Sequence, residues 1–279
     1  MGAQDPRTNL QGQIDFRLRR QLQCYSKQDP PPNRVKPIPF QVINRISQVS
    51  DASTHSDVHC ISDMIILAFF FLLRPGEYTA NPSDSTPFTF SNVSLHASNM
   101  RINIFTCTFE ELDTADFGTL EFTTQKNAVR GEVIGLGRSN HPTCCPVKSL
   151  IRRIKHLRSN NAPPITPLSV YYHQNTQHKV MPRDITHTLR DAVNFLTPAA
   201  LGFNPADIEA RSLRAAGAMA LLCANVDSDR IRIVGRWRSD EMFRYLHPQA
   251  QPLMQNFAQR MVAGGTFVLL PNQEVPLNP

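Results

Sequence analysis

Two arginines three residues apart, Arg211 and Arg214, begin an apolar segment that continues to about residue 222. Its apolar and small residues recur at helical spacing, which predicts a helix that packs closely against another element. Side chains three residues apart lie side by side on a helix, and the free N–H groups at its N-terminus favour an anion. The pair could therefore bind a phosphate, although an isolated pair of this kind is more often a solvated basic face.

A second group of chemically capable side chains follows this helix, in the sequence Gly235-Arg236-Trp237 and then Tyr245. Trp237 is the only tryptophan of the chain and is expected to anchor it against a helix. A tyrosine can attack a phosphorus atom as a nucleophile, but Tyr245 taken alone is more simply a core residue. Ser239 is a good N-cap, which predicts a helix over residues 239–246.

Two charged residues, Arg74 and Glu77, follow the longest apolar run of the chain, residues 64–73. A helix that is apolar on every side belongs in the core, so both would be polar groups held at its buried end. The pair Pro75-Gly76 predicts a turn at this point. Further along, Lys126 falls between two segments of β-rich composition, which places it in a turn of a sheet.

The segments that must position these residues indicate an α+β fold, mainly α-helical, with helices around a small antiparallel β-sheet. The first helix is expected near Phe40, and the second from Ser56 to about residue 73. Further helices are expected at 146–158, 183–196, 205–210, 212–224, 227–234, 239–246 and 250–262. Strands are expected at 88–90, 100–105, 120–124 and 132–136.

The composition indicates which partners and compartments suit the chain. It has 279 residues and a formal net charge of +6, and 23 of its 29 basic residues are arginine. Arginine presents a planar fork that binds phosphate in a bidentate way, so this excess indicates phosphate-bearing partners. The longest apolar run is about half of the roughly 20 residues that cross a membrane, and the N-terminus lacks a secretory signal. The cysteines match neither a disulfide framework nor a CxxC metal pair, which favours reduced thiols inside a cell.

These motifs together resemble the catalytic domain of the tyrosine recombinase, or phage integrase, family. That family carries an arginine after its second core helix, a lysine in a β-turn, a His/Lys-x-x-Arg box, a His or Trp after a glycine, and a tyrosine nine residues later. The corresponding residues occur here in the same order between about residues 38 and 262: Arg74, Lys126, Arg211, Arg214, Arg236 and Tyr245. The Gly-Arg-Trp-x-Ser-Asp sequence is most similar to recombinases of eukaryotic Crypton and DIRS-like mobile elements.

The resemblance implies a nuclear enzyme that cuts and rejoins double-stranded DNA through a covalent 3′-phosphotyrosine. No metal or cofactor is expected, and the protein would self-associate on DNA as a dimer or a tetramer. Tyr245 would attack the scissile phosphate, and Lys126 would protonate the departing 5′ oxygen.

The remaining motif residues would bind the phosphate or support the residues that do. Arg74 and Arg214 would clamp it, and Arg211 and Arg236 would add further donors. Glu77 would orient Arg74, and Trp237 would supply packing.

Two positions depart from the family pattern. Arg211 stands where a His or Lys is usual, and Arg236 stands where a His or Trp is usual. Arginine donates hydrogen bonds to phosphate but cannot act as a base, since its pKa exceeds about 12. Two other interpretations therefore stay open: an inactive DNA-binding protein derived from such a recombinase, and a type IB topoisomerase, which fits the short upstream region less well.

Three regions are expected along the chain. Residues 1–37 would be a basic segment and Pro-rich linker, the remnant of an upstream DNA-binding domain. Either the rest of that domain is missing, or the chain is a fragment of a longer open reading frame. Residues 38–262 would form the recombinase catalytic domain. Residues 263–279 would form a C-terminal tail that docks on a neighbouring protomer or adds an edge strand locally.

Overall fold

The computed structural model describes residues 36–80, 87–123 and 131–237, together with Arg7, Ile14, Phe16, residues 18–21 and Gln259. Contacts between residues divide the chain into two units, Met1–Arg34 and Val35–Pro279. The elements that follow all belong to the second unit. The helices expected at 239–246 and 250–262 lie outside the described residues, apart from Gln259, as does the tail at 263–279.

The core is built around one apolar helix, α3 (Ser56–Phe70), whose central residues are buried on every side. Three other amphipathic helices pack against it: α2 (Phe40–Asp51), α6 (Pro146–Ser159) and α7 (Pro182–Phe195). The sequence predicted all four of these helices, α3 from its N-cap and continuous apolar run, and the other three as amphipathic segments. A helix that is apolar all round is stable only where other elements cover it, which explains the central place of α3.

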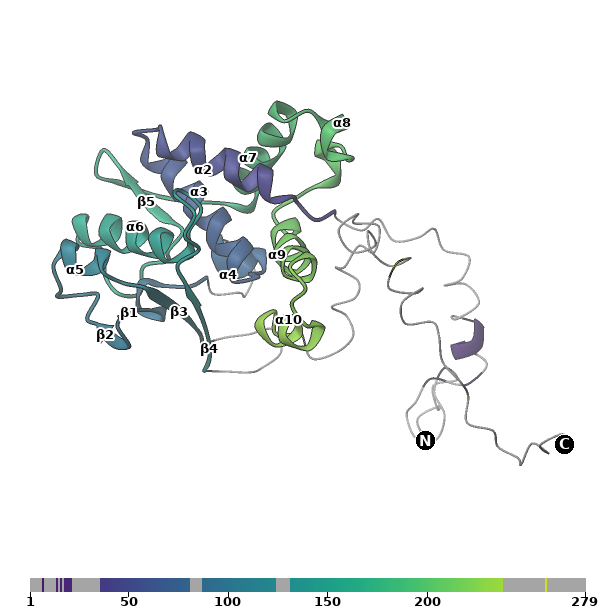
Figure 1. The fold of residues 1–279 in the computed structure, drawn as a ribbon, viewed down its shortest axis with the longest axis horizontal. Helices are drawn as coiled ribbons and strands as arrows, with labels where there is room; N and C mark the ends of the chain where they lie inside the picture. Colours follow the sequence, from purple (N-terminus) through teal and green to yellow (C-terminus); the bar gives the residue numbers. More distant parts are fainter. Residues whose placement is uncertain are drawn as a thin grey trace, which may run out of the picture. The chain divides into compact units, whose positions relative to one another are not determined.

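A four-stranded antiparallel sheet lies beside these helices, in the order β2-β1-β3-β4 (Figure 1). Its strands are β1 (Val93–Ala97), β2 (Met100–Ile102), β3 (Phe117–Phe122) and β4 (Glu132–Gly137). Helix α6 packs closely on the sheet at Gly118, where an added Cβ would lie 2.7 Å from Leu150 Cδ1. The α+β class with a small antiparallel sheet is thereby confirmed.

Some local predictions were wrong in instructive ways. Residues 88–90 do not form a ladder strand: Thr89 makes one isolated bridge to Pro167, and the 3-10 helix η1 (Phe90–Asn92) follows. The amide of Thr89 donates to Asn92 Oδ1 at 2.8 Å, and this side-chain bond turns the chain before β1 begins. The segment 205–210 is only a 3-10 turn, η2 (Pro205–Asp207).

Other elements were not predicted. A hairpin of β5 (Val170–His173) and β6 (Thr176–Lys179) turns at Gln174 and Asn175, which have φ of 47° and 61°. Positive φ at both turn residues is typical of a two-residue hairpin, but the usual glycine is missing and the turn is hard to recognise from the sequence. Two short helices, α5 (Phe109–Asp113) and α8 (Pro198–Leu201), were also missed.

Helices α4 (Pro75–Tyr78) and α9 (Ser212–Cys223) pack against α3, and α10 (Ser228–Val234) packs against α9 (Figure 1). The helices α9 and α10 were predicted from their spacing, whereas the turn expected at Pro75-Gly76 is the first turn of α4. None of the helices in the described ranges is both long enough and apolar enough to cross a bilayer.

Candidate functional site

The site begins where helix α3 ends. The helix was expected to reach residue 73, but it stops at Phe70 because Leu72 adopts a left-handed conformation with φ of 52°. The amide of Leu73 then donates to the carbonyl oxygen of Ala68 at 3.0 Å, which closes the helix in a Schellman turn. The carbonyl oxygens of Phe71 and Leu72 are left without helical partners, in a place where both residues are fully buried.

Helix α10 ends in the same way. Arg236 has φ of 57°, and the amide of Trp237 donates to the carbonyl oxygen of Arg232 at 3.0 Å. This turn frees the carbonyl oxygens of Val234 and Gly235. The ends of α3 and α10 thus present four carbonyl oxygens that need donors, and each helix adds the negative end of its dipole.

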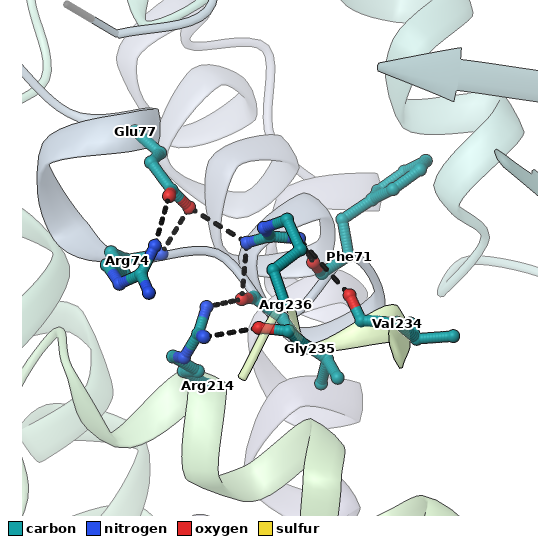
Figure 2. Close-up of polar contacts among 8 residues, drawn as sticks. Phe71, Arg74, Glu77, Arg214, Val234, Gly235 and Arg236 are labelled. Atoms are coloured by element: carbon teal, nitrogen blue, oxygen red, sulfur yellow. Dashed lines mark hydrogen bonds and ion pairs between the residues drawn. The ribbon is translucent and has the colours of Figure 1, made fainter. Parts of the chain in front are cut away.

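Two arginines bridge these helix ends (Figure 2). One terminal nitrogen of Arg214 donates to the Leu72 carbonyl oxygen at 2.6 Å, and the other donates to the Gly235 carbonyl oxygen. Arg236 donates from one terminal nitrogen to the carbonyl oxygens of Phe71 and Val234, each at 3.2 Å. Its other terminal nitrogen donates to the Leu72 carbonyl oxygen at 3.1 Å. Cations at helix C-termini are stabilised, so the two guanidinium groups hold the helix ends together.

A carboxylate joins this cluster to a third arginine. Glu77 Oε2 accepts from the Arg74 amide at 2.8 Å, and Glu77 Oε1 lies 3.0 Å from an Arg74 terminal nitrogen. The same Oε2 lies 3.1 Å from Arg236 Nη2. Arg74 is the N-cap of α4, and Glu77 occupies the third helical position, so the spacing of a capping box brings the pair together. Figure 2 shows Glu77 between Arg74 and Arg236.

The three arginines differ in what they can offer to a ligand. The Arg236 side chain is 1% exposed, whereas that of Arg74 is 28% exposed. Burial lowers the pKa of Arg236 to about 10, the Glu77 carboxylate opposes this change, and the charge of Arg74 adds to it. Arg236 therefore stays charged at neutral pH. Arg74 keeps N–H groups that have no acceptor in the part of the chain that the structure describes, and these can bind an anion from solution.

Close packing of α9 on α3 positions Arg214. A Cβ added at Gly217 would lie 2.1 Å from the carbonyl oxygen of Phe69 and 2.3 Å from Leu72 Cδ2. The close approach that the small residues of α9 predict is therefore confirmed. Trp237 packs in the same place, with the Arg214 guanidinium carbon 4.2 Å from its ring centroid.

The end of the sheet reaches this cluster through Phe122, the last residue of β3. The Arg236 guanidinium carbon lies 3.9 Å from the centroid of the Phe122 ring. Glu132, which begins β4 opposite Phe122, is close enough for its charge to raise the pKa of Arg236. Lys126 belongs to the connection between these two strands and lies outside the described residues.

Arg211 does not join the cluster through any described contact. It is the N-cap of α9, its side chain is 60% exposed, and its Nε lies 2.9 Å from Glu209 Oε2. Arg214 is 3% exposed. The two arginines therefore face different surroundings although only three residues separate them.

Of the residues that the sequence singled out, the structure brings five together: Arg74, Glu77, Arg214, Arg236 and Trp237. Tyr245 lies outside the described residues, eight residues beyond Trp237, where the continuously described segment 131–237 ends.

Sequence reasoning missed the carbonyl acceptors and two side chains, Phe122 and Tyr78. The hydroxyl of Tyr78 donates to the Ala210 carbonyl oxygen at 2.9 Å and ties α4 to the start of α9. Nothing in the sequence around Phe122 or Tyr78 distinguishes them from ordinary core aromatics.

No protein-family model matches the chain, and a search of curated proteins finds no similar sequence. The described residues contain no group of three or more His, Cys, Asp or Glu side chains placed to hold a metal ion.

Proposed function

We propose that this protein is a tyrosine recombinase that cuts and rejoins double-stranded DNA through a covalent 3′-phosphotyrosine, with no metal or cofactor in the reaction. One observation supports this proposal most: Arg74, Arg214 and Arg236 meet from three separate segments of the chain around a single carboxylate and two helix ends. The tyrosine recombinase arrangement of helices around this sheet is part of the proposal, as are nuclear location, an origin in a Crypton-like or DIRS-like mobile element, and self-association on DNA.

In this scheme the arginines stabilise negative charge on the phosphate. Arg74 offers exposed N–H groups and would donate to the non-bridging oxygens of the scissile phosphate. Arg214 is buried and both of its terminal nitrogens donate to backbone carbonyl oxygens, so it would join Arg74 on the phosphate by exchanging one of these bonds. Arg211 would add a donor from the start of α9. Such donors favour the transition state because its negative charge exceeds that of the bound substrate.

Tyr245 would attack the phosphorus atom and displace the 5′ oxygen, and Lys126 would give that oxygen its proton. A phenol with a pKa of about 10 is only about 0.1% ionised at neutral pH. Arginine groups nearby would favour the phenolate and therefore the attack. The phosphotyrosine conserves the energy of the broken phosphodiester, so rejoining needs no nucleotide hydrolysis.

A second candidate function is that of a DNA-binding protein derived from such a recombinase but inactive. One observation favours it: Arg236 is buried and donates to groups of its own chain, and neither Arg236 nor Arg211 can accept a proton.

Nicked suicide duplexes distinguish the two functions, because only an active enzyme becomes covalently attached to them. Randomised flanks offer many candidate cleavage sites in one experiment. A recombinase forms a covalent adduct with the strand labelled at its 5′ end, and Tyr245→Phe abolishes that adduct. The matched control is Tyr171→Phe, a tyrosine on β5, which should retain it. Tight duplex binding with no adduct from any member of the pool would establish the DNA-binding function instead.

A further inference from the structure

We infer that Arg236 is a positioning residue: it fixes Glu77, and through Glu77 it sets the orientation of Arg74, without contacting the phosphate itself. This inference rests on the proposed function. The sequence suggests that Arg236 is an additional phosphate donor, whereas this inference makes it a support for Glu77. The position that is usually His or Trp in the recombinase family would then have a different role in this chain.

The hydrogen bonds of Arg236 leave little for a ligand. Its two terminal nitrogens carry four N–H groups, and four acceptors surround them: the carbonyl oxygens of Phe71, Leu72 and Val234, and Glu77 Oε2. Its Nε is buried and has no hydrogen-bond partner among the described residues. The Phe122 ring covers one face of the guanidinium. A phosphate could reach this group only by displacing bonds that hold two helix ends.

Glu77 is the element that Arg236 shares with Arg74. The Glu77 side chain is 12% exposed, and each of its oxygens accepts from Arg74, through the side chain at Oε1 and through the amide at Oε2. Arg236 approaches Oε2 from the opposite side, from the end of α10. Loss of Arg236 would leave a mostly buried carboxylate with one cation in place of two, held only by the amide and the guanidinium of Arg74. The Arg74 guanidinium would then be less restricted in its orientation.

Lysine cannot replace this function although it keeps the charge. A single ammonium has three N–H groups on one nitrogen, so it cannot span acceptors on α3, α4 and α10 as a planar fork does. Arg236→Lys therefore separates geometry from charge.

A double-mutant cycle tests the inference, with the rate of adduct formation on a saturating suicide duplex as the readout. Arg236→Lys should slow the step by about tenfold or more, since small misplacements of a clamp are costly, while the Kd for uncut duplex changes by less than about threefold. In an Arg74→Ala background the same substitution should have almost no further effect, because the residue that it orients is gone. If Arg236→Lys instead slowed the Arg74→Ala variant by the same factor as the unmodified protein, Arg236 would act on the phosphate independently, which would overturn the inference.

Arg211→Gln is the matched control in the same cycle. Arg211 has no described contact with Glu77 or Arg74, so its effect should multiply with that of Arg74→Ala. Glu77→Gln should reproduce the Arg236→Lys phenotype, and Glu77→Gln combined with Arg236→Lys should be no slower than the worse single variant. A double variant slowed by the product of the two single factors would contradict the inference that Arg236 acts through Glu77.

A measurement without catalysis keeps the inference separate from the proposed function. In protein labelled with nitrogen-15 arginine, the Arg74 guanidinium resonances, assigned by their loss in Arg74→Lys, should show restricted rotation that Arg236→Lys relieves. Unchanged Arg74 resonances would overturn the inference. If Arg74 responds but no duplex ever forms an adduct, the positioning role stands and the proposed function fails.

Discussion

The guanidinium of Arg214 lies 2.6 Å from the carbonyl oxygen of Leu72, so the first turn of α9 is fastened to the end of α3. This bond exists because Leu72 adopts positive φ and turns its carbonyl out of the helix. A candidate phosphate ligand is thereby held by the backbone of the core helix. The site and the core share these residues, so a substitution that disturbs the packing of α9 on α3 should also disturb the arginine cluster.

Gly217→Ala should lower both the stability of the fold and the affinity for duplex DNA. The added Cβ would meet the Phe69 carbonyl oxygen at 2.1 Å, and a backbone atom cannot move aside as a side chain can. Overpacking costs about 1–3 kcal/mol of the free energy of unfolding, against the roughly 1 kcal/mol that alanine gains in helix propensity. Because the clash is with a backbone atom, we expect the upper part of that range and a net loss of stability. Urea denaturation measures the loss, and duplex affinity should fall with it because Arg214 moves away from Leu72.

Gly137→Ala is the control for that substitution. The nearest atom to a Cβ at Gly137 is the Asp116 carbonyl oxygen at 3.8 Å, an ordinary contact. Its effect on unfolding should stay within about 0.5 kcal/mol. Equal losses in the two glycine variants would show that the contact between α9 and α3 is not as close as described.

Tyr78→Phe tests the link between α4 and the start of α9. The Tyr78 hydroxyl is buried and donates to the Ala210 carbonyl oxygen at 2.9 Å. Its removal leaves a carbonyl unpaired, at a cost of about 1–3 kcal/mol. Thermal unfolding should show a lower Tm than in Tyr171→Phe, a tyrosine that stacks on His178; equal Tm values would contradict the assigned hydrogen bond.

Much of the scaffold could be predicted from the sequence. Apolar residues at helical spacing are typical of α2, α6, α7, α9 and α10. The N-cap at Ser56 and the continuous apolar run after it predicted α3. The hairpin of β5 and β6 was missed because its turn uses Gln174 and Asn175, without the glycine that such turns usually carry. The predicted end of α3, at residue 73, was wrong because nothing in the sequence indicates that Leu72 adopts a positive φ.

The site was predictable only in part. The spacing of Arg74 and Glu77 matches a capping box, and this pair could be expected to interact. That Arg211 is exposed while Arg214 is buried could not be predicted, because it depends on which side of α9 faces the ends of α3 and α10. The carbonyl oxygens that hold Arg214 and Arg236 belong to the backbone, which carries no residue-specific information.

Folding stability should depend on pH through His156. Burial, together with the charge of Arg153 and the nearby His59, lowers the pKa of His156 from 6.5 to about 4, and its Nε2 accepts from the Tyr172 amide at 2.9 Å. The unfolded chain then binds the proton more readily, so this contribution is complete above pH 6.5 and is lost as the pH falls toward 4. The slope is at most about 1.4 kcal/mol per pH unit.

His156→Gln provides the comparison, because its amide oxygen can still accept from Tyr172 but does not titrate. Denaturation at a series of pH values between 7 and 4 should show a smaller loss of stability in this variant than in the unmodified protein. Parallel curves would mean that His156 is not buried in its neutral form.

Duplex binding should depend steeply on salt. Each phosphate contact contributes about 0.9 to the slope of log affinity against log salt concentration. Arg211 is exposed beside Glu209, so Arg211→Gln should lower the slope by about one, whereas Arg183→Gln, a change on the exposed N-terminal turn of α7, should leave it unchanged. A slope near zero in the unmodified protein would argue against any DNA-binding function.

The most direct test of the central claim is to locate the covalent bond. After reaction with the suicide duplex and nuclease digestion, trypsin cleavage at Arg244 and Arg260 releases residues 245–260, which contain one tyrosine. Mass spectrometry should find this peptide carrying a nucleotide through a phosphotyrosine at Tyr245. An adduct on a different residue, or unmodified peptide alone in a preparation that binds the duplex tightly, would contradict the recombinase mechanism.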